Sequence, residues 1–283
     1  MKSLVIPPPI EIIRAQCAQV LAEDLGIKNS DPSAALISEN KVLQAEVICR
    51  ETAIICGRPW FDEIIHQLAS EINIDWQVSE GEQVNANSLL CSLHGPARPL
   101  LSAERSALNF LQTLSATATQ THRYVKAIKD TSTQLLDTRK TLPGLRLAQK
   151  YAVLCGGGNN HRIGLFDMIM LKENHIIAAG SITGSIAEAR KQFPGIAIEV
   201  EVETLTQLRE TLDADVTRIL LDNMNIETLH QAVEITAGKT PLEASGGVDL
   251  NTIRNIALTG VDYISTGAIT KHIQAVDLSM RFM

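Results

Sequence analysis

Four short runs in the second half of the chain decide the fold: IEVE at 198–201, ILLD at 219–222, LEAS at 242–245 and YIST at 263–266. Each run has the length and apolar content of a buried strand, and each ends in a polar or small residue. The last residues of the runs follow one another at intervals of 21, 23 and 21 positions, and a helical pattern fills each interval. This alternation predicts βα units that form a parallel sheet.

Two earlier runs, QLLD at 134–137 and MIMLK at 168–172, bring the series to about six units. A complete barrel of this kind has eight units. The sequence therefore predicts a protein of the α/β class whose C-terminal domain, residues 103–269, is an open and incomplete α/β barrel. Helices are expected at 103–114 and 119–129, ahead of the first strand.

Residues 1–102 mix strands and helices without strict alternation, which predicts a separate domain. Apolar residues at helical spacing predict a helix at 10–25, and Pro59 precedes a second helix at 60–70. Strands are expected at 41–52, 75–78 and 88–93. The tail, residues 270–283, is too short for another βα unit and could return to the first domain.

The composition excludes several classes of function. There are 25 Lys and Arg against 32 Asp and Glu, and the net charge of −7 disfavours a nucleic-acid or anionic-membrane binder, which needs a positive footprint. No apolar run approaches the ~18 residues that a membrane helix needs. The five cysteines form no CxxC pair, and their odd number argues against a disulfide or zinc framework. A cytoplasmic protein with reduced thiols is expected.

Positive charge is concentrated between residues 138 and 172, where six basic residues stand with one acid, Asp167, in a chain that is acidic overall. Catalytic groups of parallel barrels lie at the carboxyl ends of the strands, and several of these cations are placed there. Such a concentration suits a polyanionic small molecule, bound through charged hydrogen bonds, although a solvated basic face is the alternative. The six residues are Arg139, Lys140, Arg146, Lys150, Arg162 and Lys172.

Carboxylates and small residues end the other strands. Glu201 and Asp222 end adjacent strands, where they could hold Mg²⁺ or form salt bridges with the cations of the barrel mouth. SGG at 245–247 and TG at 266–267 follow the last two strands, where many barrels bind phosphate through backbone N–H groups, although these glycines could also be structural turns. The GGGNN stretch at 156–160 is interpreted as a mobile loop that delivers His161 and Arg162.

A set of short motifs runs through most of the chain: ER (104–105), LNFLQ (108–112), DTRKT (137–141), PGLR (143–146), GGGNNHR (156–162), GL (164–165), LKENH (171–175), EVE (199–201), LDNM (221–224), EASGG (243–247) and STGA (265–268). In this order and spacing the set resembles the quinolinate phosphoribosyltransferase family, also called carboxylating nicotinate-nucleotide pyrophosphorylases. Departures from the family pattern, at Ala116, Leu142 and Lys271-His272, do not touch the charged residues.

The resemblance implies an N-terminal α/β sandwich domain at 1–102, on which the tail could pack, and an open α/β barrel at 103–269 that carries the phosphoribosyltransferase site. It implies the transfer of a phosphoribosyl group from phosphoribosyl pyrophosphate to quinolinate, which gives nicotinate mononucleotide, pyrophosphate and CO₂ in de novo NAD biosynthesis. It also implies a requirement for Mg²⁺, and a homodimer or larger assembly, such as a hexamer, in which Arg105 is supplied across the subunit interface.

The same resemblance assigns the site residues. Lys140, Lys172, Glu201 and Asp222 are expected to be catalytic, and Glu201 and Asp222 would hold Mg²⁺ or the ribose hydroxyls. Lys140 would face the pyrophosphate, with Thr138 beside it in the substrate site. The quinolinate carboxylates would be bound by Arg105, Arg139, His161, Arg162 and Lys172. The 5′-phosphate would lie against Ser245, Gly246, Gly247, Thr266, Gly267 and Ala268.

Three other interpretations are open from the sequence. A relative on the same scaffold, such as a nicotinate phosphoribosyltransferase or a molybdenum-transport-associated protein, would bind a ligand with fewer negative charges. A barrel aldolase or isomerase would use Lys172 as a Schiff-base lysine. A non-catalytic protein would bind the same anions without turnover.

Overall fold

The computed structural model describes residues 5–283, which divide into two compact units. Unit 1 contains the chain up to residue 122 together with residues 142–157 and 273–283. Unit 2 contains residues 123–141 and 158–272. Each unit is therefore assembled from separate stretches of the sequence.

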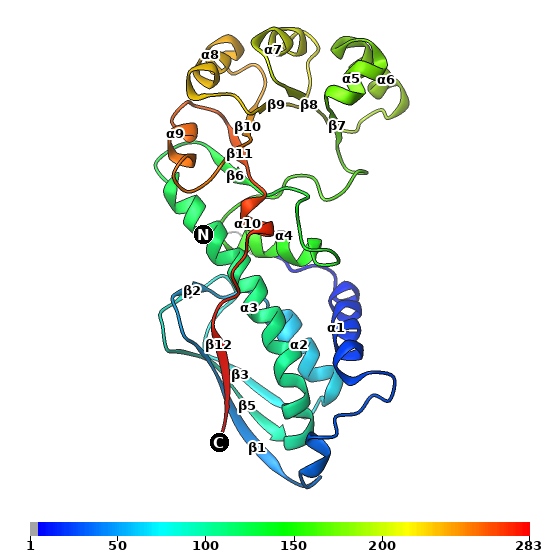
Figure 1. Ribbon diagram of the computed structural model, residues 1–283, viewed down its shortest axis with the longest axis vertical. Helices are drawn as coiled ribbons and strands as arrows, with labels where there is room; N and C mark the ends of the chain where they lie inside the picture. Colours follow the sequence, from blue (N-terminus) through cyan, green and yellow to red (C-terminus); the bar gives the residue numbers. More distant parts are fainter. Residues whose placement is uncertain (1–4) are drawn as a thin grey trace. The chain divides into compact units, whose positions relative to one another are not determined.

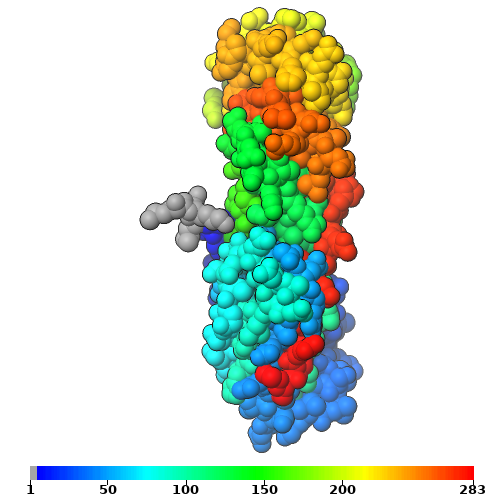
Figure 2. All heavy atoms as spheres, turned by 90° about the vertical axis from the view of Figure 1, so that its left-hand side faces the viewer, coloured from blue at the N-terminus to red at the C-terminus, as the bar shows by residue number. Residues whose placement is uncertain are grey.

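Unit 1 is built on a four-stranded antiparallel sheet in the order β12-β1-β5-β3. The C-terminal strand β12 pairs along β1, from Ala45 opposite Phe282 to Cys49 opposite Leu278, and Figure 2 shows this red strand against the blue of β1. The tail thus forms one edge of the sheet in unit 1. The strands are β1 (Val42–Cys49), β3 (Asn73–Trp76), β5 (Ser88–Pro96) and β12 (Leu278–Phe282), and a separate pair joins β2 (Ala53–Ile54) to β4 (Gln83–Val84).

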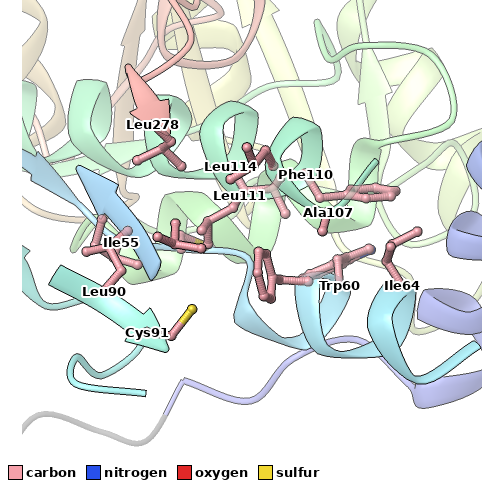
Figure 3. Packing of buried hydrophobic residues seen from close by; sticks show 14 of the residues in the cluster. Ile55, Trp60, Ile64, Leu90, Cys91, Ala107, Phe110, Leu111, Leu114 and Leu278 are labelled. Carbon is pink, nitrogen blue, oxygen red and sulfur yellow. The ribbon is translucent and has the colours of Figure 1, made fainter. Parts of the chain in front are cut away.

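Helices pack on this sheet around an apolar core. Trp60 and Ile64 of α2, and Leu111 and Leu114 of α3, meet strand residues such as Leu90 in the packing that Figure 3 shows. Full burial of such side chains contributes about 1.5–3 kcal/mol each. The helices of unit 1 are α1 (Ile10–Leu25), η1 (Ala34–Leu36), α2 (Arg58–Leu68), α3 (Ala97–Ala127), whose last turn belongs to unit 2, and α4 (Arg146–Cys155).

Unit 2 is a six-stranded parallel sheet in the order β6-β11-β10-β9-β8-β7. The first two strands in sequence, β6 and β7, form the two edges, so the barrel is open between them as the sequence predicts. In Figure 1 the helices α5 to α9 line the outer side of the arc of strands. The elements are β6 (Gln134–Leu136), β7 (Ile169–Leu171), α5 (Glu173–Ala179), α6 (Ile182–Gln192), β8 (Ile198–Val202), α7 (Leu205–Leu212), β9 (Arg218–Asp222), α8 (Ile226–Thr236), β10 (Leu242–Ser245), α9 (Ile253–Ala257), β11 (Tyr263–Ser265) and α10 (Ala268–Lys271).

The structure differs from the predicted local structure at three places. The helices predicted at 103–114 and 119–129 are one helix, α3, because residues 115–118 contain no Pro or Gly that would end it. The helix α4 is missing from the predicted elements. The glycines after it are not simply the predicted mobile loop, since Gly156 ends α4 and a Cβ there would collide with the backbone of Ala118 and the side chain of Thr121. Close packing therefore requires this glycine.

Among residues 5–283, every helix is too short or too polar to cross a membrane.

Candidate active site

Side-chain alternation gives the sheet of unit 2 one apolar face and one polar face. The register pairs Glu199 with Arg218, and both Glu201 and Glu243 with Leu220, so all of these side chains share a face. The opposite face carries buried apolar residues such as Val200 and Leu221. The polar face is completed by Met170, Asp222, Ser245, Tyr263 and Ser265.

A buried ion cluster occupies the polar face. The Nε2 atom of His161 lies 2.9 Å from a Glu199 carboxylate oxygen and 3.3 Å from one of Glu243. Arg218 Nη1 lies 2.7 Å from Glu243 and 3.9 Å from Glu199, and its guanidinium stacks 4.4 Å from the ring centre of Tyr263. Both carboxylates have no exposed surface. Two buried acids are therefore matched by two basic side chains.

This cluster sets the charge of His161. Burial by itself lowers the pKa of His161, but the hydrogen bonds and charges of Glu199 and Glu243 outweigh burial and raise it to about 9. Burial likewise raises the pKa of Glu243, yet hydrogen bonds from His161, Ser265 and Arg218 bring it down to about 2. Burial and the negative charge of Glu243 raise the pKa of Glu199. The two carboxylates thus favour the protonated form of His161.

The segment before His161 is bound to strand β6. The N–H of Asn159 donates to the carbonyl of Leu135 at 2.8 Å, and the carbonyl of Asn159 accepts from the N–H of Asp137 at 3.1 Å. The buried Asp137 carboxylate accepts the N–H of His161 at 2.8 Å. The N–H of Arg162 points at His161 Nδ1 at 2.7 Å, a contact that favours neutral imidazole and so opposes the two carboxylates.

Arg162, which follows this segment, interacts electrostatically with Arg139. Arg162 is half-buried and donates to the carbonyl of Met168 at 3.1 Å. Burial and the nearby positive charge of Arg139 lower the pKa of Arg162. The repulsion between these two positive charges costs free energy, and an anionic ligand would offset that cost.

Lys172 and Glu201 form an ion pair at the carboxyl ends of β7 and β8. The ammonium Nζ lies 2.5 Å from Glu201 Oε2, and the side chain of Lys172 is 46% exposed. The salt-bridge alternative for Glu201 therefore holds in this structure. One carboxylate oxygen of Glu201 is bound by Lys172, and the second is the oxygen that could meet a substrate or a cation.

Residues that follow β6 and β11 meet at one place. The N–H of Lys140 donates to Thr138 Oγ1 at 3.0 Å, and the hydroxyl of Thr270 donates to the Lys140 carbonyl at 2.8 Å. A Cβ at Gly267 would lie 2.8 Å from the Lys140 side chain, so glycine leaves room for that lysine. The buried Thr266 lies directly before Gly267, and its hydroxyl accepts the N–H of Ala268 at 3.2 Å.

A second glycine turn follows β10. Gly246 has a φ of +97°, and a Cβ there would collide with the side chain of Asn223. The N–H of Asn223 donates to the Ser245 carbonyl at 2.9 Å, and its amide donates to an Asp222 carboxylate oxygen, also at 2.9 Å. Gly247 has a φ of +60° with open space around its Cα. Both glycines are exposed, and the space beside Gly247 is open.

The structure divides the predicted cationic set. Arg139, Lys140, Arg162 and Lys172 belong to unit 2 with the acids and the glycine turns. Arg146 and Lys150 lie on α4 in unit 1, where Lys150 is buried. Arg105 is an exposed residue of α3, also in unit 1. The remaining site residues predicted from the sequence, from Thr138 to Ala268, all lie in unit 2.

Four residues of the site are not among those predicted from the sequence: Asp137, Glu199, Arg218 and Glu243. Glu199 and Glu243 sit inside the runs IEVE and LEAS, where a charge between apolar residues in a buried strand is the signal that could have identified them. Their ligand atoms and that of His161 lie within 4.8 Å of one another, a spacing that a metal could bridge. Arg218 and His161 already contact both carboxylates, so the geometry favours an ion cluster over a metal site.

Known proteins match the whole chain. Models of the N-terminal and C-terminal domains of quinolinate phosphoribosyl transferase match residues 32–115 and 117–281. The probable carboxylating nicotinate-nucleotide pyrophosphorylase of Synechocystis sp. is 40% identical over 280 residues, which are 98% of this chain and 94% of that protein. The counterpart in Bacillus subtilis is 39% identical over 260 residues, which are 91% and 89%. The solved nicotinate-nucleotide pyrophosphorylase of Francisella tularensis has a TM-score of 0.95 at 46% identity and covers 100% of both chains. The chain belongs to the quinolinate phosphoribosyltransferase family.

Proposed function

We propose that this protein transfers the phosphoribosyl group of phosphoribosyl pyrophosphate to the ring nitrogen of quinolinate and releases pyrophosphate and CO₂. The product is nicotinate mononucleotide, a precursor of NAD. The observation that carries the proposal is that Arg139, Arg162 and Lys172 share unit 2 with the acids and the glycine turns, and that the positive charge of Arg139 acts on Arg162. Three neighbouring cations fit a dicarboxylate better than a ligand with one carboxylate.

Quinolinate and phosphoribosyl pyrophosphate are both anions and repel each other. A concentrated positive field overcomes that repulsion and raises the association rate. Arg139 and Arg162 are proposed to bind the quinolinate carboxylates, together with Lys172, whose ammonium is partly exposed at the strand end. The ring nitrogens of the buried His161 face Glu199, Glu243 and the N–H of Arg162, so His161 is proposed to position Arg162 and not to contact the carboxylates directly. Each charged hydrogen bond is worth about 1.5–3 kcal/mol.

The phosphoribosyl pyrophosphate would lie along the ends of β6, β9, β10 and β11. Lys140 faces the pyrophosphate, next to Thr138. The backbone N–H groups at 245–247 and 266–268 fit the 5′-phosphate, because glycines there let the backbone approach closely. Asp222 and the second oxygen of Glu201 fit the ribose hydroxyls.

The chemistry needs no covalent intermediate with the protein. As pyrophosphate leaves, positive charge develops on the ribose ring, and the carboxylates of Glu201 and Asp222 stabilise that charge. Lys140 and Lys172 stabilise the negative charge of the leaving group. The carboxylate beside the ring nitrogen then departs as CO₂. Its electron pair stays on that ring carbon, where the positive ring nitrogen stabilises it, and a proton from solvent then adds to the carbon to give the product.

Mg²⁺ is proposed to bind with the phosphoribosyl pyrophosphate. Asp222 and Glu201 offer carboxylate oxygens, the ligands that this ion prefers, and Mg²⁺ would neutralise charge on the pyrophosphate. Only one oxygen of Glu201 is free of Lys172, which suits an ion that keeps waters and substrate phosphates as its other ligands. Removal of Mg²⁺ with a chelator should abolish turnover, and its return should restore it.

A homodimer is proposed to complete the site, with Arg105 supplied by the second copy. The turn after Arg162 exposes two large apolar side chains, Leu165 and Phe166, which are 70% and 75% exposed. Asp167 fixes this turn by accepting the N–H groups of Ile163 and Gly164 at 2.7 and 2.9 Å. This apolar turn is held by hydrogen bonds and directly follows Arg162, which is proposed to bind the substrate. Such an exposed apolar surface fits one that a second copy of the chain covers.

The direct test is to incubate the purified protein with quinolinate, phosphoribosyl pyrophosphate and Mg²⁺ and to measure nicotinate mononucleotide and CO₂. The variants Arg105→Ala, Arg162→Ala and Lys172→Ala should each lose most of the turnover. Near-normal turnover in all three would remove the site assignment.

Two alternatives have distinct outcomes in the same assay. Turnover with nicotinate but not with quinolinate would identify the monocarboxylate-specific relative. Trapping of a carbonyl substrate on Lys172 by borohydride would identify a Schiff-base enzyme, but the half-exposed Lys172 is bound to Glu201, whereas Schiff-base lysines are desolvated.

A further inference from the structure

A buried cluster in unit 1 brings together Cys56, Glu80 and Cys155. The two sulfur atoms and a carboxylate oxygen all lie within 4.8 Å of one another. Cys56 has no exposed surface, and the other two residues are partly buried. The proposed reaction uses none of these groups, so their convergence calls for a separate explanation.

The backbone holds the donors in place. The N–H of Cys56 donates to Ser115 Oγ at 2.9 Å, and the same hydroxyl donates to the carbonyl of Cys56 at 3.1 Å. Gly81, which follows Glu80, is so close to the end of α4 that a Cβ on it would lie 3.3 Å from the Cys155 carbonyl oxygen. Loop, turn and helix end are therefore held close to one another without a ligand.

The Glu80 carboxylate is oriented by the start of α2. One oxygen accepts the N–H of Gly57 at 2.6 Å, and the other accepts the N–H of Arg58 at 3.2 Å. Burial raises the pKa of Glu80, and these N–H groups together with the positive charge of Arg58 oppose that rise. Arg58 also supplies a cation beside a site that would carry excess negative charge.

The thiols are linked to each other and to this carboxylate. The thiol of Cys56 interacts electrostatically with Cys155 and Glu80, and Tyr151 interacts in the same way with Cys155. Burial, followed by the interactions with Cys155 and Glu80, raises the pKa of the Cys56 thiol well above its usual value. Both cysteines are free thiols, so a soft cation would bind by displacing their protons.

We propose that Cys56, Glu80 and Cys155 form a binding site for a thiophilic divalent cation of the Zn²⁺ type. In a tetrahedral zinc site with sulfur and oxygen ligands, the ligand atoms are about 3.3–3.8 Å apart, so this cluster needs a contraction of about 1.5 Å at most. The Tyr151 hydroxyl or a water completes four ligands. Binding releases the two thiol protons to solvent, and Arg58 balances the remaining negative charge.

The position of the cluster in the chain gives the cation a structural role. Cys155 is the last residue of α4, and the chain enters unit 2 at Gly158, three positions before His161. A cation on Cys155 would anchor the point from which the segment with His161 and Arg162 departs. Thermal stability of unit 1 should rise on binding.

The test is a Co²⁺ titration of the reduced, metal-free full-length protein in excess Mg²⁺, which occupies sites made of oxygen ligands. Thiolate-to-Co²⁺ charge-transfer absorption should appear, saturate at one equivalent and vanish when Zn²⁺ is added. Cys155→Ala and Glu80→Gln should bind Co²⁺ at least about tenfold more weakly. Cys17→Ala and Cys49→Ala remove buried cysteines outside the cluster and should leave the absorption unchanged.

Zn²⁺ should also raise the melting temperature of the wild type but not that of Cys155→Ala, a variant at a partly exposed position. Apparent affinity should increase with pH, because two protons leave on binding. The absence of charge-transfer absorption in the wild type, or its persistence in Cys155→Ala, would overturn the proposal. A third result would also overturn the proposal. If the reduced protein takes up no Co²⁺ but oxidised glutathione forms a Cys56–Cys155 disulfide, the pair is a thiol switch and not a metal site.

Discussion

At the scale of single residues, the polar face of unit 2 uses carboxylates of the same strand for different tasks. Glu199 and Glu201 are two positions apart on β8 and share a face. Glu199 is fully buried against His161, whereas Glu201 lies nearer the strand end and binds Lys172. The position along the strand therefore gives the two carboxylates different tasks. Glu199 influences the charge of His161, and Glu201 can contact the substrate.

The charge of His161 should depend on Glu243. In Glu243→Gln the pKa of His161 should fall from about 9 toward its ordinary value of 6.5, because one of two buried negative charges is lost. In the wild type the folded state binds one more proton than the unfolded state between these pH values. The free energy of unfolding should thus decline as the pH rises from 6.5 through 9.

Titration of the His161 imidazole by NMR, with unfolding at pH 6.5 and 9, checks this prediction. The variant should lose most of the pH dependence in that window. It should also be less stable by about 3 kcal/mol below pH 6.5, because a buried ion cluster is broken. An imidazole that titrates near 6.5 in both proteins would contradict the assigned role of the carboxylates.

Lys172→Met should lower turnover strongly but change the free energy of unfolding only slightly. The ion pair with Glu201 is half-exposed, so its loss should change the free energy of unfolding by no more than about 1 kcal/mol. Turnover should fall about 100-fold or more if the ammonium stabilises charge in the transition state. Lys191→Met, which removes the exposed pair with Glu188 on α6, is the matched control and should keep full turnover. Equal effects of the two substitutions would argue against a catalytic Lys172.

At the scale of elements, the site is built from residues at and just beyond the carboxyl end of each strand. The parallel order of the sheet brings six carboxyl ends to one edge, so the cations after β6 and β7 meet the acids of β8 and β9 and the glycine turns after β10 and β11. The glycines are required by geometry at defined places. Gly246 has a positive φ, and a Cβ on it would collide with Asn223. A Cβ on Gly267 would collide with the side chain of Lys140.

Gly246→Ala should weaken phosphoribosyl pyrophosphate binding. The added Cβ collides with Asn223, which is bound to Asp222, so both the turn and the acid should move. The KM for phosphoribosyl pyrophosphate should rise about tenfold, while the KM for quinolinate changes little. Gly238→Ala also substitutes a glycine of positive φ, but in open space, and should cost only about 1 kcal/mol of stability. A normal KM in Gly246→Ala would remove the turn from the phosphate site.

At the scale of the whole molecule, the chain builds each unit from discontinuous segments. The tail returns to pair with β1, and α4 belongs to unit 1 although it lies between β6 and β7 in sequence. Consequently Arg105 and the other predicted substrate cations are carried by different units. A second copy that supplies Arg105 is the arrangement that the family resemblance implies.

Co-expression of Arg105→Ala with Lys172→Ala tests the shared site. If Arg105 acts across a dimer interface, each mixed dimer contains one site with both residues intact. Random pairing should then restore about one quarter of wild-type turnover, although each variant alone is inactive. Turnover no higher than that of the separate variants, in a sample shown to contain mixed dimers, would place Arg105 in its own subunit's site or outside the site.

The sequence by itself determined the βα repeat, the open barrel and the residues at the strand ends, because strand length and spacing are local properties of the chain. The helix at 10–25 also followed from local periodicity and the Gly26 stop. Tertiary structure alone decided that Arg146 and Lys150 lie on a helix of unit 1, and that Gly156 is packed tightly. It also decided that Glu199, Arg218 and Glu243 enclose His161, because the identity of a buried charge's partners depends on which strands are neighbours and at what depth each side chain lies.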